Sequence, residues 1–128
     1  MPRKLYPLLI TLALLLAQRV SPGPVPILIS VVPMATYAPA TILVKLILEP
    51  HQDNRVMCWG YESQTDFRRS CEELEGIKAP KNYWFTYKNV PKGSYEAFVE
   101  LFRAPKAALA GSYTAKFRVF PEIGDPND

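Results

Sequence analysis

Few side chains in this 128-residue chain combine the residue types and spacing that catalysis or metal binding requires. His51 is the only histidine and lies in a polar turn segment. As a general base or metal ligand it would need partner groups brought from distant parts of the chain. Glu72, Glu73 and Glu75 form an acidic cluster that lacks the regular oxygen spacing of a calcium loop. We therefore predict no catalytic residue, no metal site and no cofactor, and we expect that the protein is not an enzyme.

Cys58 and Cys71 are the only cysteines. In an exported protein, such a pair is more naturally a disulfide than a metal site or a reactive thiol. If the flanking segments form a hairpin with the cysteines opposite each other, residues 63–66 form its four-residue loop. This register puts Glu72 on the same side as Met57, which calls for a bulge or an edge position. We predict a Cys58–Cys71 disulfide, with two free or buried thiols as the alternative.

The N-terminus has the form of an export signal. Arg3 and Lys4 precede the apolar run "LYPLLITLALLLA" of residues 5–17, which is typical of a secretory leader. A membrane-spanning helix needs about 20 apolar residues, and this run ends sooner. We predict a signal peptide over residues 1–17, with a retained signal anchor as the alternative. The mature protein is then expected in the periplasm or at the cell surface, and it meets the membrane only if the apolar segment is kept.

The net charge gives no sign of a nucleic-acid partner. The whole chain carries +3, with 15 Lys and Arg against 12 Asp and Glu. Removal of residues 1–17 takes away Arg3 and Lys4, which leaves 13 basic residues against the same 12 acidic ones. A nearly neutral domain with scattered charges lacks the basic patch that nucleic-acid binding requires.

The elements that hold these residues are predicted to be short strands. Thirteen prolines fall mostly between apolar runs, so long helices are hard to place. The runs alternate with a period of two, as half-buried strands do. Residues 42, 44, 46 and 48 share one face, as do residues 95, 97, 99 and 101. We predict a Pro-rich extended linker over residues 18–38, a β-sandwich over 39–121 and a flexible tail over 122–128.

The stretch "VPKGSYEAFVELFR" contains the features of a strand that begins at a sharp corner. Gly93 gives the backbone freedom for that corner, and Tyr95 can bury its ring and return its hydroxyl to the backbone upstream, as a tyrosine corner does. With "PATILVKLILEPHQDNR", "LEGIKAPKNYWFTY" and "YTAKFRVF", this pattern resembles bacterial exported domains of the immunoglobulin-like, fibronectin type III-like class. The resemblance implies an all-β sandwich of about seven antiparallel strands. Ala97 stands where antibody-type domains have a cysteine, so their inter-sheet disulfide is not expected.

Aromatic side chains supply the remaining candidates for function. Trp84, Phe98, Phe102 and Phe120 fall on faces opposite the inferred core, and exposed aromatic patches often mark partner surfaces. Two alternatives are packing of Phe98 and Phe102 against the Pro-rich N-terminal segment, and stacking on sugars. The sequence leads us to expect a non-catalytic secreted or periplasmic interaction or structural module, with another envelope protein as its partner. The alternatives are a membrane-anchored accessory subunit of a membrane protein complex and a carbohydrate-binding module.

Overall fold

The computed structural model describes residues 25–124. The predicted leader, with its signal helix, lies outside these residues, as does the end of the predicted tail. The described chain forms eight strands and one short 3-10 helix: β1 Ile27–Val32, β2 Ala35–Tyr37, β3 Ala40–Leu48, β4 Asn54–Glu62, β5 Phe67–Glu73, η2 Gly76–Lys78, β6 Asn82–Val90, β7 Gly93–Arg103 and β8 Ala108–Phe120.

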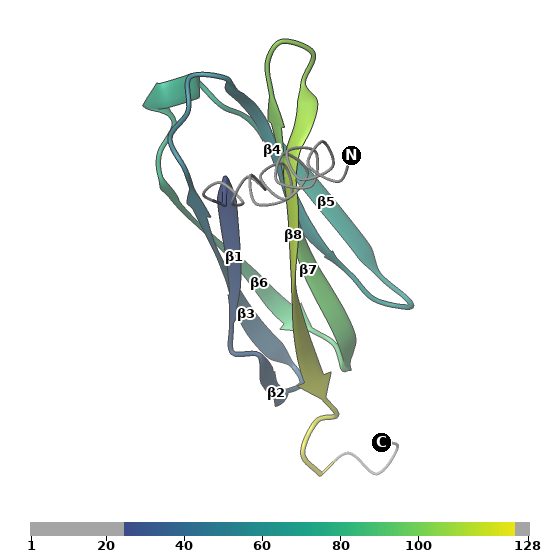
Figure 1. Cartoon of the computed structure of the whole chain (residues 1–128). Helices are drawn as coiled ribbons and strands as arrows, with labels where there is room; N and C mark the ends of the chain where they lie inside the picture. Colours follow the sequence, from purple (N-terminus) through teal and green to yellow (C-terminus); the bar gives the residue numbers. More distant parts are fainter. Residues whose placement is uncertain (1–24, 125–128) are drawn as a thin grey trace, which may run out of the picture.

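The strands form two sheets that face each other, so the expectation of an all-β protein is confirmed. One sheet has the order β1-β3-β6 and the other the order β2-β8-β7-β4-β5. Figure 1 shows β1, β3 and β6 in one layer and β4, β5, β7 and β8 in the other. The count of about seven antiparallel strands was short by one. The additional strand, β2, is three residues long and pairs with β8 in parallel.

The sandwich also begins earlier than the sequence indicated. Residues 27–32 and 35–37, which were placed in an extended linker, form β1 and β2. In β1, Ile27 and Val31 point into the core and are buried, while β1 pairs with β3 along its whole length. The chain crosses between the two sheets near Pro33. Because proline lacks a backbone N–H, it ends a ladder of hydrogen bonds without preventing strands on either side.

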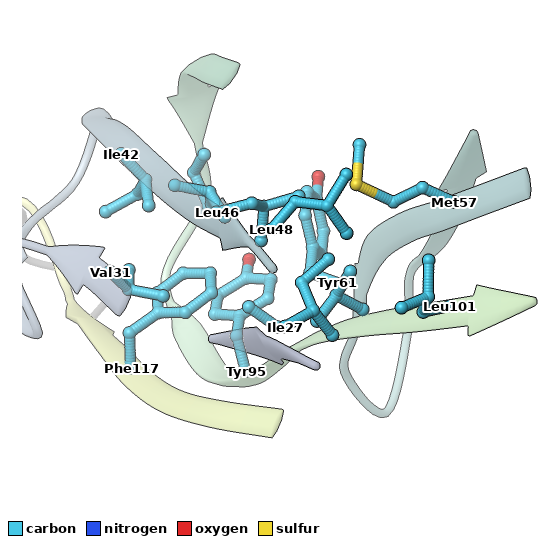
Figure 2. Packing of buried hydrophobic residues seen from close by; sticks show 14 of the residues in the cluster. Ile27, Val31, Ile42, Leu46, Leu48, Met57, Tyr61, Tyr95, Leu101 and Phe117 are labelled. Atoms are coloured by element: carbon cyan, nitrogen blue, oxygen red, sulfur yellow. The ribbon is translucent and has the colours of Figure 1, made fainter. Parts of the chain in front are cut away.

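The core is built from every second side chain of the long strands. The inward residues of β3 and β7 are buried: Ile42, Val44, Leu46, Leu48, Tyr95, Ala97, Val99 and Leu101. Figure 2 shows several of these side chains packed between the layers. Each fully buried aliphatic side chain contributes roughly 1.5–3 kcal/mol relative to an exposed one. The alternation in the sequence therefore marks which side of each strand holds the two sheets together.

Three aromatic rings pack in the core beside the turn between β6 and β7. The ring of Tyr95 stacks on Phe117 with centroids 4.9 Å apart, and Tyr61 meets Tyr95 edge-on at 5.4 Å. The Tyr95 hydroxyl donates a hydrogen bond of 2.6 Å to the carbonyl of Pro91. Gly93 between them has φ +155°, a region that other residues rarely adopt. Burial is the main reason that the pKa of Tyr95 is raised, so its hydroxyl keeps the proton that it donates.

Candidate binding face of the five-stranded sheet

The disulfide lies at one edge of the five-stranded sheet, and its prediction is confirmed. Cys58 of β4 and Cys71 of β5 are bonded and stand directly opposite each other. Cys58 is buried and Cys71 is exposed. Glu72 does lie opposite Met57, on the inner side of the sheet. This polar residue is accommodated because β5 is an edge strand with all its residues exposed.

The four aromatic residues that the sequence grouped as a partner surface lie on two different sheets. Phe98, Phe102 and Phe120 belong to β7 and β8 and lie on the outer side of the five-stranded sheet. Trp84 belongs to β6 in the other sheet, where 67% of it is exposed. Alternation along a strand shows which side chains point outward, but it does not show which sheet the strand joins. The four residues therefore do not form one patch.

The outer face of the five-stranded sheet contains a shallow hollow of about 280 Å³. We name it the acidic–aromatic hollow. Strands β4, β5, β7 and β8 supply its lining: Glu62, Phe67, Arg69, Glu96, Phe98, Glu100, Ser112 and Thr114. Of these residues, only Phe98 was among the sequence candidates.

Two phenylalanine rings form the apolar part of the hollow. Phe67 of β5 and Phe98 of β7 stack with centroids 5.8 Å apart and planes at 13°. Gly60 of β4 lies between these strands, and a Cβ atom there would come within 3.0 Å of the Phe98 ring and overlap the carbonyl of Arg68. Only glycine therefore allows Phe98 to reach across β4 to Phe67. More than half of Phe67 remains exposed, so one ring of the stack is open to a ligand.

Only some of the charged residues of the hollow form ion pairs. Arg69 Nε lies 3.3 Å from Oε1 of Glu100, which accepts its hydrogen bond. Glu62 and Glu96 stand directly opposite each other on β4 and β7. Neither makes an ion pair within residues 25–124, although Lys116 of β8 stands across from Glu96. Three carboxylates and one guanidinium leave the lining with a net charge of −2.

Facing carboxylates of this kind lower the stability of a sheet. Like charges directly opposite each other on neighbouring strands repel. A cation bound between them would remove that repulsion. The sequence shows that Glu62 and Glu96 are acidic but not that they face each other. They are 34 positions apart, and nothing in the sequence shows that β4 and β7 are neighbours.

The other groups that could do chemistry do not gather into a site. His51 Nδ1 accepts a hydrogen bond of 3.0 Å from the backbone N–H of Asp53, which fixes the turn after β3. In the described part of the chain, no three His, Cys, Asp or Glu side chains are arranged to hold a metal ion. None of the helices within residues 25–124 is long and apolar enough to cross a membrane.

Comparisons with known proteins give a likeness of fold and no family. No protein-family model matches the chain, and no curated protein matches it. Among solved structures, the chain is similar to superoxide reductase (neelaredoxin) from Ignicoccus hospitalis, with a TM-score of 0.57 and 17% identity over 73% of this chain and 79% of that one. A single-residue variant of the same enzyme gives a TM-score of 0.55 at 16% identity, over 73% of this chain and 78% of that one.

This likeness corrects the expected function. The sequence favoured a non-catalytic exported interaction or structural module, but solved chains that share the fold include those of a redox enzyme. That expectation is therefore wrong, and we retain neither it nor its two alternatives. At 17% identity the likeness shows the fold and transfers no activity. A redox metal takes imidazole or thiolate ligands, whereas this chain has one histidine and both cysteine sulfurs form the disulfide. The residues present therefore do not fit such a metal.

Proposed function

We propose that the acidic–aromatic hollow binds an organic cation, an ammonium or guanidinium group carried on an apolar body. The observation that supports this proposal is the facing pair of carboxylates, Glu62 and Glu96, beside the open Phe67–Phe98 stack. The carboxylates attract the charged end of such a ligand, and the rings pack against its apolar end. A neighbouring hollow also contains Glu62 and Glu96 but lacks the two phenylalanine rings.

The expected strength of binding follows from the exposure of the site. A cation over the face of an exposed aromatic ring gains roughly 0.5–1 kcal/mol, and an exposed ion pair gains about 0.2–1 kcal/mol. Two carboxylates and one ring therefore supply only a few kcal/mol together. The hollow fits a ligand that is abundant, or one that belongs to a larger molecule with further contacts.

The proposal is tested with three probes of one shape and different charge: benzylammonium, benzyl alcohol and benzoate. Each is titrated into the protein while NMR spectra report the ring signals of Phe67 and Phe98. We expect saturable shifts with benzylammonium, much weaker shifts with the alcohol and none with benzoate. Equal binding of the alcohol and the ammonium ion would show that charge plays no part. An absence of shifts with all three probes would reject the hollow as a ligand site.

We also propose that the domain is immunoglobulin-like and that the protein is exported. The fold leaves both points open. The hydrogen bond from Tyr95 to Pro91 has the form of a tyrosine corner. The Cys58–Cys71 disulfide suits an oxidising compartment outside the cytosol. N-terminal sequencing of the protein from an envelope fraction tests export: a start beyond residue 17 supports it, and intact protein in the cytosolic fraction contradicts it. A partner in the envelope stays a prediction.

A further inference from the structure

Strand β6 forms an edge of the three-stranded sheet and differs from the other sheet edges. Within residues 25–124, no strand pairs with β6 on the side away from β3. It is nine residues long, whereas the edge strand β2 has three. The remaining edge of the same sheet, β1, lies beside β8. A long open edge presents a row of backbone donors and acceptors to another chain.

The two long edges, β5 and β6, carry opposite kinds of side chains. In β5, four of seven residues are charged: Arg68, Arg69, Glu72 and Glu73. In β6, Lys88 is the one charged residue, and four of the nine residues are aromatic: Tyr83, Trp84, Phe85 and Tyr87. Charged side chains on an edge strand discourage pairing with other chains. This protection is present on β5 and nearly missing from β6.

Apolar surface beside β6 is left incompletely covered on both sides of the sheet. On the inner side, Phe85 and Tyr87 stay partly exposed, whereas Ile42 and Val44, which face them from β3, are fully buried. On the outer side, 67% of Trp84 is exposed. An additional strand along this edge would cover both sides at once. The edge therefore has the features of a surface that pairs with another strand.

We propose that this edge pairs antiparallel with β6 of a second copy of the chain, joining two three-stranded sheets into one of six strands. The strand is self-complementary. If residues 84–88 pair about a twofold axis normal to the sheet, Thr86 lies on the axis opposite its counterpart. Trp84 then faces Lys88 of the other copy, where the ammonium group can lie over the indole ring. Phe85 faces Tyr87, and the two Lys88 side chains stay apart.

The test places a cysteine at the twofold axis. In Thr86→Cys the two introduced thiols would be directly opposite each other, where Cβ atoms are about 4.5–5.5 Å apart, and mild oxidation should link the copies. Ile47→Cys is the control, because Ile47 is also exposed on a strand but belongs to β3, which pairs with β1 on one side and with β6 on the other. We expect a covalent dimer from the first variant and none from the second, with the Cys58–Cys71 bond intact in both.

Sedimentation of the full chain, as the cell produces it, provides the second arm. We expect a dimer that Thr86→Lys weakens about tenfold or more, because it puts two like charges on the axis. Circular dichroism of this variant should match the wild type, since Thr86 is exposed. A wild-type chain that sediments as a monomer overturns the proposal. A dimer that survives Thr86→Lys and is not linked through residue 86 also overturns it, because its interface then lies elsewhere.

Discussion

The outer faces of the two sheets differ, although both come from strands with the same alternation. On the five-stranded sheet, Phe67 and Phe98 stack over Gly60, and charged residues surround them. On the three-stranded sheet, the exposed apolar residues Leu28, Val32, Ile47 and Trp84 stand without an acidic neighbour among the cross-strand partners described. The difference shows that a binding face depends on which residues become neighbours across strands, and not on the pattern of any one strand.

Loss of the disulfide should lower the stability of the protein the most. Within the folded protein, it should loosen only the five-stranded sheet. Cys58→Ala with Cys71→Ala opens a loop with a sequence separation of 13. The free energy of unfolding should fall by about 3 kcal/mol, as measured by urea denaturation. Hydrogen exchange should rise in β5, which has no buried residue of its own, and stay unchanged in β3. Equal loss of protection in both sheets would contradict this division.

Gly60→Ala should disturb the same face from its centre. The added methyl group would overlap the Arg68 carbonyl and crowd the Phe98 ring, so β5 or the ring must move. We expect a loss of about 1–3 kcal/mol in the free energy of unfolding. Thr41→Ala, on the outer face of the other sheet, serves as the control and should stay within about 0.5 kcal/mol of the wild type. A Gly60→Ala protein as stable as the wild type would show that the close approach is not needed.

Phe98→Ala and Trp84→Ala test whether only one of the two outer faces binds benzylammonium. Phe98 forms part of the hollow, whereas Trp84 lies on the other sheet. Loss of the Phe98 ring should weaken benzylammonium binding about fivefold, equivalent to ~1 kcal/mol. Loss of Trp84 should leave the dissociation constant unchanged. A similar loss in both variants would mean that the two faces do not act separately.

Neutralising one facing carboxylate should have the smallest effect and an unusual sign. Glu62→Gln removes the repulsion from Glu96, so the ligand-free protein should become more stable by about 0.2–1 kcal/mol. Glu100→Gln is the matched control, because Glu100 accepts a hydrogen bond from Arg69. That variant should lose a few tenths of a kcal/mol. Denaturation curves with opposite shifts support the account, and a loss of stability in Glu62→Gln contradicts it.

The sequence was sufficient to predict features that depend on neighbouring residues within one strand or one hairpin. The inward residues of β3 and β7 follow from a period of two, and the pairing of Cys58 with Cys71 follows from the length of the hairpin loop. Features that depend on the order of strands in a sheet could not be predicted. The neighbourhood of Glu62 and Glu96 exists because β7 pairs with β4. For the same reason Trp84 was grouped wrongly with Phe98.

Titration with benzylammonium, comparing the wild type with the double variant Glu62→Gln, Glu96→Gln, tests the central claim most directly. Glu75→Gln is the control, since Glu75 lies outside the hollow. We predict that the double variant keeps the fold and the Phe67–Phe98 stack but binds the ammonium ion no better than benzyl alcohol. Undiminished binding of benzylammonium by the double variant would contradict the claim that the facing carboxylates make this surface a site for cations.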